Sequence, residues 1–196
     1  NLSRGAGVSG YEQWLGRGRF TLDIRPESGR RSVNKLEDED WEAILERGGV
    51  PQDRWPELID CFNDWVDRDD AHRLNGAESD DSFYRERGYE VKNAPVDLVD
   101  ELLLIKGFDA RILYGGPADE EDAEPMPGIA QWLTAWEAGN QVNLNTATPE
   151  VLWTIAGIDA RTIDAIIEAR KGPDGEEGTW YDGFENVDEA IALLKD

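Results

Sequence analysis

The chain has 196 residues, with 43 Asp and Glu against 20 Lys and Arg, so its formal net charge is −23 at pH 7. A negative field of this size repels phosphate backbones and disfavours nucleic acids as partners. Hydrophobic residues make up 39% of the chain, which is enough for a buried core, but no stretch approaches the ~18 apolar residues of a membrane span. The composition therefore predicts a folded acidic protein that attracts cations or basic protein surfaces.

The N-terminal part of the sequence predicts a small number of strands. Residues 1–18 are rich in glycine and are expected to form a loop or a frayed end. Apolar and polar residues alternate over 20–24 (FTLDI), which is the period of a strand with one buried face. A turn at 26–29 and a short run at 31–34 predict a hairpin partner for this strand.

Helical patterns dominate the rest of the chain. Helices are expected at 38–47, after Pro56, and at 99–105, 128–138, 149–156, 160–170 and 187–194. Asp97 is the expected N-cap of the helix at 99–105. A carboxylate-rich loop at 67–84 and an acidic, Gly- and Pro-containing linker at 115–128 separate these helices.

One internal repeat is present. Residues 100–111 (DELLLIKGFDAR) align with residues 150–161 (EVLWTIAGIDAR). Each copy predicts a helix, a glycine turn and a second helix, with the glycine left-handed and the aspartate at the N-cap. These residues are Gly107 and Gly157, and Asp109 and Asp159. The repeat therefore predicts stacked helical hairpins.

The sequence offers little for catalysis. It has one histidine, His72, and one cysteine, Cys61, which lies in an apolar run and is expected to be a buried structural thiol. We find no nucleophile in a recognisable setting, no phosphate-binding glycine loop and no Cys/His metal cluster. Pairs of carboxylates are so frequent that they arise by chance. We therefore expect a protein that is not an enzyme.

The acidic segment is the best candidate site. Asp60, Asp64 and Asp67 follow one another along a predicted helix face, where like charges repel unless they are solvated or share a cation. Ca²⁺ binds six to eight oxygens from carboxylates and carbonyls. The spacing partly resembles an EF-hand, but Ala71 and His72 stand where that loop needs a ligand and a glycine. A Ca²⁺ loop of another type is expected; the alternative is a solvated acidic loop.

The segment 142–170 has the pattern of a helix-hairpin-helix. In DNA-binding versions the turn offers backbone N–H groups to a phosphate and carries a second glycine. Asp159 occupies that glycine position, where its carboxylate would repel a phosphate. A structural role is therefore expected, and the alternative function is that of a competence-type helix-hairpin-helix DNA-binding protein.

Several motifs in a fixed order carry a family resemblance. They are Gly18–Ile24, Asp64–Asp69 (DWVDRD), Gly76-Ala77-Glu78, Asn93-Ala94-Pro95 and Asn143–Ala147 (NLNTA). In this order and spacing the sequence resembles GspK, the large minor pseudopilin family of the bacterial type II secretion system. The resemblance covers about residues 18–194, although the N-terminal apolar helix and the final strands of the family are missing.

The resemblance implies an α+β fold in which a pseudopilin-like strand scaffold carries a large inserted α-helical domain with helix-hairpin-helix-like repeats. Residues 1–35 would begin the scaffold, and residues 36–196 would form the mainly helical domain. The family implies a place at the pseudopilus tip, in a hetero-oligomeric complex with other minor pseudopilins. It also implies a periplasmic location, with an inner-membrane anchor only through the missing helix.

The resemblance further implies Ca²⁺ in the helical domain, in agreement with the acidic segment. By their positions in the family motifs, Asp67, Asp69 and Glu78 are the Ca²⁺ ligands that the resemblance implies, and Asp70 and Asp81 are implied less directly. Ser79-Asp80 resembles an insertion beside Glu78, so the second acidic position departs from the family pattern.

Overall fold

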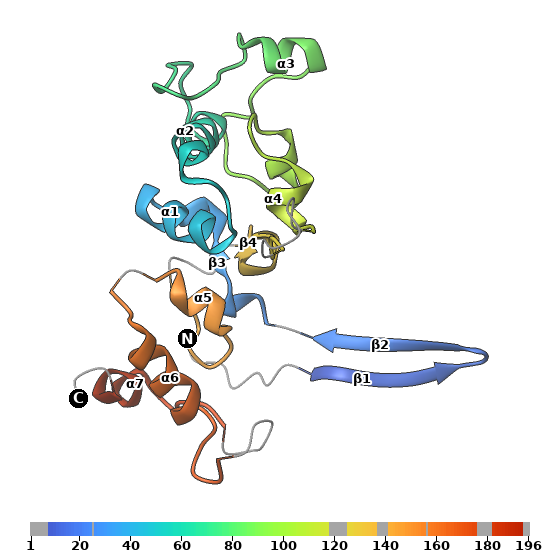
Figure 1. Cartoon of the computed structure of the whole chain (residues 1–196), viewed down its shortest axis with the longest axis vertical. Coiled ribbons are helices and arrows are strands. Elements are labelled where there is room, and N and C mark those ends of the chain that lie inside the picture. The colour runs from blue at the N-terminus through green and yellow to red at the C-terminus, as the bar shows by residue number, and fades with distance from the viewer. Residues whose placement is uncertain are drawn as a thin grey trace. The chain divides into compact units, whose positions relative to one another are not determined.

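A computed structural model gives two compact units, one made of residues 1–30 and 141–196 and the other of residues 31–140 (Figure 1). The structure describes residues 8–24, 26–117, 125–136, 141–155, 157–175 and 182–193. Half of the linker predicted at 115–128, residues 118–124, therefore lies outside the described residues. The predicted division into 1–35 and 36–196 does not coincide with these units and stays a prediction.

A two-stranded antiparallel hairpin lies in the first unit (Figure 1). Strand β1 (Val8–Leu15) pairs with β2 (Gly18–Ile24), and Gly16 has a φ of +63° in the turn between them. The strand predicted at 20–24 is confirmed. The loop predicted for residues 1–18 is wrong over β1, and the partner strand precedes β2 instead of following it at 31–34.

The hairpin exposes large apolar side chains. Its register places Tyr11 opposite Leu22, and Leu15 and Phe20 lie on the same face as this pair. All four side chains are exposed, and Leu15 has 76% of its surface open. The opposite face carries Trp14, which is also exposed, and an ion pair in which Arg19 Nη1 lies 3.2 Å from Glu12 Oε2. The hairpin thus presents an apolar face that no described residue covers.

Three short helices complete this unit: α5 (Pro149–Trp153), α6 (Ala160–Ala169) and α7 (Val187–Leu193). Their core contains Val151, Leu152, Ile163, Ile166, Phe184 and Ala190. The NLNTA segment connects to the chain that follows β2, because the backbone N–H of Asn143 donates to Ser28 O at 2.8 Å. Arg170 Nη1 donates to Ala147 O at 2.6 Å, which joins the C-terminal end of α6 to the last residue of the segment.

The second unit is mainly helical. Its named helices are α1 (Asp38–Arg47), α2 (Trp55–Val66), α3 (Ser82–Arg87) and α4 (Ala110–Tyr114). Strand β3 (Arg31–Ser32) pairs in parallel with β4 (Leu133–Thr134). The helix predicted at 128–138 is therefore wrong, since a 3-10 turn at Ala130–Trp132 leads directly into β4.

The core of this unit forms where α1 and α2 face each other. Trp41, Ile44 and Leu45 of α1 and Leu58 and Phe62 of α2 are all buried, as their helical spacing predicts. The Trp41 and Phe62 ring centroids lie 4.7 Å apart. Each such side chain contributes roughly 1.5–3 kcal/mol by burial. This packing holds α2, from whose end the acidic segment begins.

The two repeated segments share their turns but not their first helices. Gly107 and Gly157 have φ values of +90° and +82°, as the repeat predicts. Asp109 and Asp159 each accept a hydrogen bond of 2.8 Å, from Ile112 N and Thr162 N. The segment Val99–Leu104 is a 3-10 helix and not an α-helix.

Asp97 does not cap that 3-10 helix, contrary to the prediction. The N-cap is Leu98, which makes no side-chain capping bond. The Asp97 carboxylate instead accepts a 2.8 Å hydrogen bond from Lys92 Nζ. The Asp97 carboxylate thus pairs with Lys92 and not with the N-terminus of the 3-10 helix.

The coarse prediction of a mixed strand-and-helix fold is confirmed. Within the part of the chain that the structure describes, no helix is both long enough and apolar enough to traverse a bilayer. Trp180 and Tyr181 follow a Gly-rich stretch of the sequence, which is compatible either with a partner surface or with packing under the last helix; both lie outside the described residues.

Candidate functional site

We use the name acidic loop for residues 67–81, which leave the C-terminal end of α2 and are held against that helix. Asp60 Oδ2 accepts hydrogen bonds from Asn75 N at 2.9 Å and from Asn75 Nδ2 at 2.8 Å. The buried Cys61 thiol donates to Asn75 O at 3.6 Å. The middle of the acidic loop is thus fixed to α2 by two side chains from consecutive positions.

A second anchor lies one turn further along α2. Both carboxylate oxygens of Asp64 lie 3.3 Å from the backbone nitrogen of Arg73, and the side chain is fully buried. Gly76 packs directly on this carboxylate, and a Cβ at position 76 would overlap its oxygens. Burial raises the pKa of Asp64, and the Arg73 N–H opposes that shift. Position 76 therefore requires glycine because the Asp64 carboxylate lies too close for a side chain, and not because of its φ.

Four oxygen atoms near this anchor are buried and have no hydrogen-bond partner among the described residues. They are Oε1 and Oε2 of Glu78, Oδ1 of Asp67 and Oδ1 of Asn93. All four are acceptors, and a buried acceptor without a partner costs about 1–3 kcal/mol. A group that supplies positive charge would satisfy all of them.

The electrostatics of Glu78 show which carboxylates surround it. Only 2% of its surface is exposed, and burial followed by the charges of Asp64, Asp67 and Asp70 raises its pKa from 4.5 to about 7. Two of the predicted ligands, Asp67 and Asp70, therefore lie close enough to a third, Glu78, for their charges to raise its pKa. Asp64, which the sequence analysis had placed on the same helix face as Asp67, acts on this pKa in the same direction.

Asn93 is a member of this cluster that the sequence analysis did not predict as a ligand. Its Nδ2 donates to Asp70 Oδ1 at 3.4 Å, which leaves its own Oδ1 buried and unpaired. Its backbone has a φ of +50°, in the left-handed region that Asn tolerates better than most residues. The Asn-Ala-Pro motif was the available signal, but nothing in the sequence places it beside residues 67–78.

The other two predicted ligands are engaged elsewhere. Asp69 Oδ1 accepts from Ala71 N at 2.9 Å, and the side chain is exposed. Asp81 caps α3 by accepting from Phe83 N at 2.8 Å, and its other oxygen lies 2.9 Å from Lys106 Nζ. These two bonds lower the pKa of Asp81. Asp81 thus caps α3, and Asp69 is an exposed side chain bonded within its own loop.

The chemistry of the cluster suits a hard cation. Among the residues that the structure describes, no three Asp, Glu, His or Cys side chains are grouped as they would be around a metal ion. The side chains would therefore have to rotate to reach the 2.3–2.6 Å distances of Ca²⁺. The unpaired atoms are nevertheless all oxygens, which Ca²⁺ prefers over the nitrogen and sulfur ligands of Zn²⁺.

The helix-hairpin-helix segment offers a different arrangement. The Asp159 carboxylate lies at the N-terminus of α6 and accepts from Thr162 N. This bond and neighbouring groups lower its pKa, so the carboxylate stays charged at neutral pH. A negative group therefore occupies the helix end that would contact a phosphate in a DNA-binding version.

Comparison with known proteins adds independent information. Residues 19–114 match the family described as Type II secretion system (T2SS), protein K. A protein from Klebsiella pneumoniae, "Type II secretion system protein K", is 38% identical over 128 residues, which cover 65% of this chain and 35% of that relative. The chain thus spans about a third of that relative's length.

A solved structure also resembles the chain. It is that of the GspK-GspI-GspJ complex from the enterotoxigenic Escherichia coli type 2 secretion system. The match has a TM-score of 0.64 at 18% identity, and it covers 96% of this chain and 64% of that chain. At this identity the likeness shows the fold.

Proposed function

We propose that this chain, which belongs to the type II secretion system protein K family through residues 19–114, is part of a minor pseudopilin that assembles with other minor pseudopilins at the tip of a pseudopilus. The family match and the relative at 38% identity support this function. The fold likeness to a solved minor pseudopilin complex supports the choice of partners. The role is non-catalytic, and the chain acts by presenting surfaces.

The architecture follows from the same proposal. Strands β1 and β2 belong to the strand scaffold of a pseudopilin, and the mainly helical residues 31–140 belong to a domain inserted into it. The segments 99–114 and 149–169 are helix-hairpin-helix-like repeats, one in each of the two units. The region lies on the periplasmic side of the bacterial inner membrane, and the anchor is the N-terminal apolar helix that the family carries.

The apolar face of the hairpin is the structural observation that carries the proposal. Tyr11, Leu15, Phe20 and Leu22 are exposed on one face of a two-stranded sheet. Exposed apolar surface of this kind marks protein–protein contacts, and an isolated hairpin is marginally stable in water. We expect this face to be covered in the assembled tip.

A pair of matched variants tests this. We would mix the purified chain with the GspI and GspJ homologues of its source organism and measure complex formation by analytical ultracentrifugation. Phe20→Asp, on the apolar face, should weaken assembly by about 2 kcal/mol, or roughly 30-fold. Thr21→Asp adds the same charge on the opposite face of β2 and should change it little. If both variants formed the complex as well as the wild type does, the hairpin would not be part of the interface.

We also propose that a Ca²⁺ ion binds at the acidic cluster, the name used here for Asp64, Asp67, Asp70, Glu78 and Asn93. Glu78, Asp67 and Asn93 would supply the oxygens that lack partners, and Asp70 would supply another beside Asn93. Asp69 and Asp81 stay predicted ligands that would have to exchange their present hydrogen bonds. Ca²⁺ would neutralise the mutual repulsion of these carboxylates and link the acidic loop to the segment around residue 93.

A further inference from the structure

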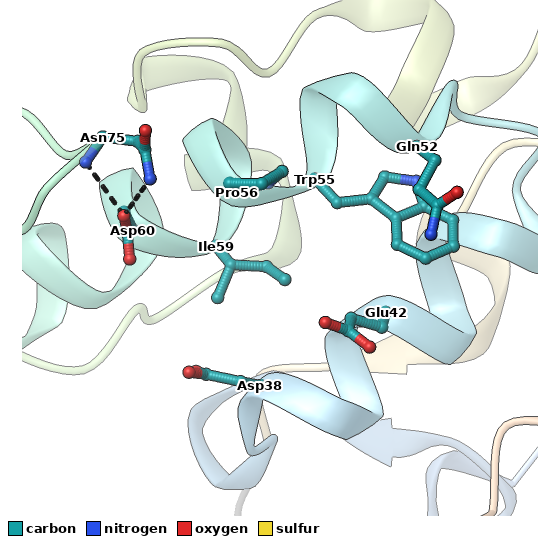
Figure 2. Close-up of a pocket in the computed structure, with 8 residues that line it drawn as sticks. All are labelled: Asp38, Glu42, Gln52, Trp55, Pro56, Ile59, Asp60 and Asn75. Atoms are coloured by element: carbon teal, nitrogen blue, oxygen red, sulfur yellow. Dashed lines mark hydrogen bonds between the residues drawn. The ribbon is translucent and has the colours of Figure 1, made fainter.

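A pocket on the second unit is not used by the proposed function. It lies between the exposed side of α1 and the start of α2 and has a volume of about 290 Å³ (Figure 2). Trp55, Pro56 and Ile59 give it an apolar wall, and Asp38, Glu42 and Asp60 give it three carboxylates. None of the residues that line it is Lys, Arg or His.

The apolar wall is rigid. Trp55 Nε1 donates to Val50 O at 2.8 Å, so the indole is held in one position beside the pocket. Ile59 is 6% exposed and lies between the two helices, facing Asp38 and Glu42 in Figure 2. The wall is therefore part of the α1–α2 packing and is formed before any ligand arrives.

The carboxylates have unused capacity. Asp60 accepts both of its hydrogen bonds at Oδ2, from Asn75, which leaves Oδ1 available (Figure 2). Asp38 accepts one bond, from Asn63 Nδ2 at 3.1 Å. Glu42 is exposed on α1, one turn beyond Asp38. The pocket thus combines an aromatic and aliphatic wall with a negative rim that carries no compensating charge of its own.

We propose that this pocket receives an arginine side chain of a partner protein. An arginine has an aliphatic stem that packs on apolar surface and a guanidinium that pairs with carboxylates and with indole rings. A free metal ion would gain nothing from Trp55 and Ile59, and an apolar side chain would leave three carboxylates partly desolvated. Charge complementarity therefore selects the occupant, and the inference holds whether or not the partner is a pseudopilin.

The test uses the whole chain and a small probe. Nα-acetyl-arginine methylamide would be titrated to about 50 mM at constant ionic strength, and the Trp55 indole N–H followed by NMR and assigned with Trp55→Phe. We expect a saturable shift in the millimolar range. The neutral isostere Nα-acetyl-citrulline methylamide should give none. Glu42→Gln should weaken arginine binding about two- to fivefold.

Glu46→Gln is the matched control, because Glu46 is also exposed on α1 but does not line the pocket. It should bind the arginine probe as the wild type does. The proposal is overturned if the arginine probe gives no saturable shift. It is also overturned if the citrulline probe binds equally well, or if Glu42→Gln and Glu46→Gln behave alike.

Discussion

The acidic cluster and the β1–β2 hairpin break the usual pattern of burial in opposite ways. In the cluster, Glu78 and Asp64 are carboxylates with almost no exposed surface. In the hairpin, Leu15 and Phe20 are apolar side chains open to solvent. Buried charge calls for a counter-charge, and exposed apolar surface calls for an apolar partner. The two regions therefore indicate two kinds of ligand on one chain.

The regions also differ in what supports them locally. The acidic loop is fixed to α2 through Asp60 and Asp64, so its geometry is set by a packed helix. Among the described residues, the hairpin is held by its own ladder, an exposed ion pair and a hydrogen bond from Tyr11 Oη to Gln13 Oε1. We therefore expect changes in the acidic cluster to alter the stability of the chain itself, and changes in the hairpin to alter mainly its assembly.

The largest effect should come from Ca²⁺. Restoring free Ca²⁺ to ~1,000 times its Kd after chelation should raise the free energy of unfolding by about 4 kcal/mol, because only the folded chain holds the site. Mg²⁺ should do less, since it prefers a rigid octahedral shell. Urea unfolding measures this. Glu78→Gln should remove most of the response, and Glu86→Gln, on exposed α3, should keep it. A full response in Glu78→Gln would place the ion elsewhere.

Gly76→Ala tests the anchor under the cluster. The new methyl group meets the Asp64 carboxylate, which is fully buried and accepts hydrogen bonds from Arg73 N, so we expect a loss of about 3 kcal/mol. In an Asp64→Ala background the same change should cost less than about 1 kcal/mol, since the obstructing oxygens are gone. Equal costs in both backgrounds would show that this contact does not fix the loop.

The pH dependence should separate Glu78 from Asp81. The folded pKa of Glu78 is about 7, above its ordinary 4.5, so the folded chain retains a proton that the unfolded chain releases. This stabilisation is complete below the ordinary pKa and is lost as pH rises through 7. In chelator, unfolding free energy should fall by about 2 kcal/mol from about pH 5 to about pH 8.

Two comparisons check the assignment of this pH dependence. Glu78→Gln should abolish the fall, whereas Glu86→Gln should retain it. Asp81 has the opposite sign, because its pKa is lowered by Phe83 N–H and Lys106. Its contribution is present above its ordinary pKa of 3.8 and is lost as pH falls, outside this window. A fall that survives in Glu78→Gln would assign it to another group.

The smallest effect belongs to the Arg19–Glu12 ion pair of the hairpin. Arg19→Gln removes the ion pair with Glu12. The Arg19 side chain is 55% exposed and the Glu12 side chain is 50% exposed. Exposed pairs contribute little, so unfolding free energy should change by less than about 0.5 kcal/mol. Chemical denaturation at low and high salt measures this. A loss several times larger would mean that the hairpin supports the fold as well as assembly.

Local patterns were enough to predict the helices at α1 and α2, the turns at Gly107 and Gly157, and the caps at Asp109 and Asp159. Each depends on residues within one or two turns of one another. Strand β1 was missed because Gly10 and the glycines before and after the strand are typical of a loop, whereas its pairing with β2 makes it a strand. The pairing of β3 with β4 joins residues about 100 positions apart, for which no local pattern exists.

The candidate site divides in the same way. Asp67, Asp70 and Glu78 were predicted from a run of carboxylates and from the family resemblance. The charges of the two aspartates raise the pKa of Glu78, and the role of all three as ligands stays a prediction. Asn93 was not predicted as a ligand because an amide carries no charge signal. Asp81 was predicted from its position, but a helix begins at Ser82 and takes its carboxylate as a cap. Competition between a cap and a ligand depends on the exact helix start, which sequence patterns place poorly.

The single cysteine has a practical consequence for labelling this protein. Cys61 is completely buried, and burial raises its pKa to about 12, so almost no thiolate exists at neutral pH. Maleimides and iodoacetamide react with the thiolate. A cysteine introduced at an exposed position, such as Thr21, can therefore carry a fluorophore or spin label without replacing Cys61. The slow rate at which Cys61 itself is alkylated would then measure how often the helical unit opens.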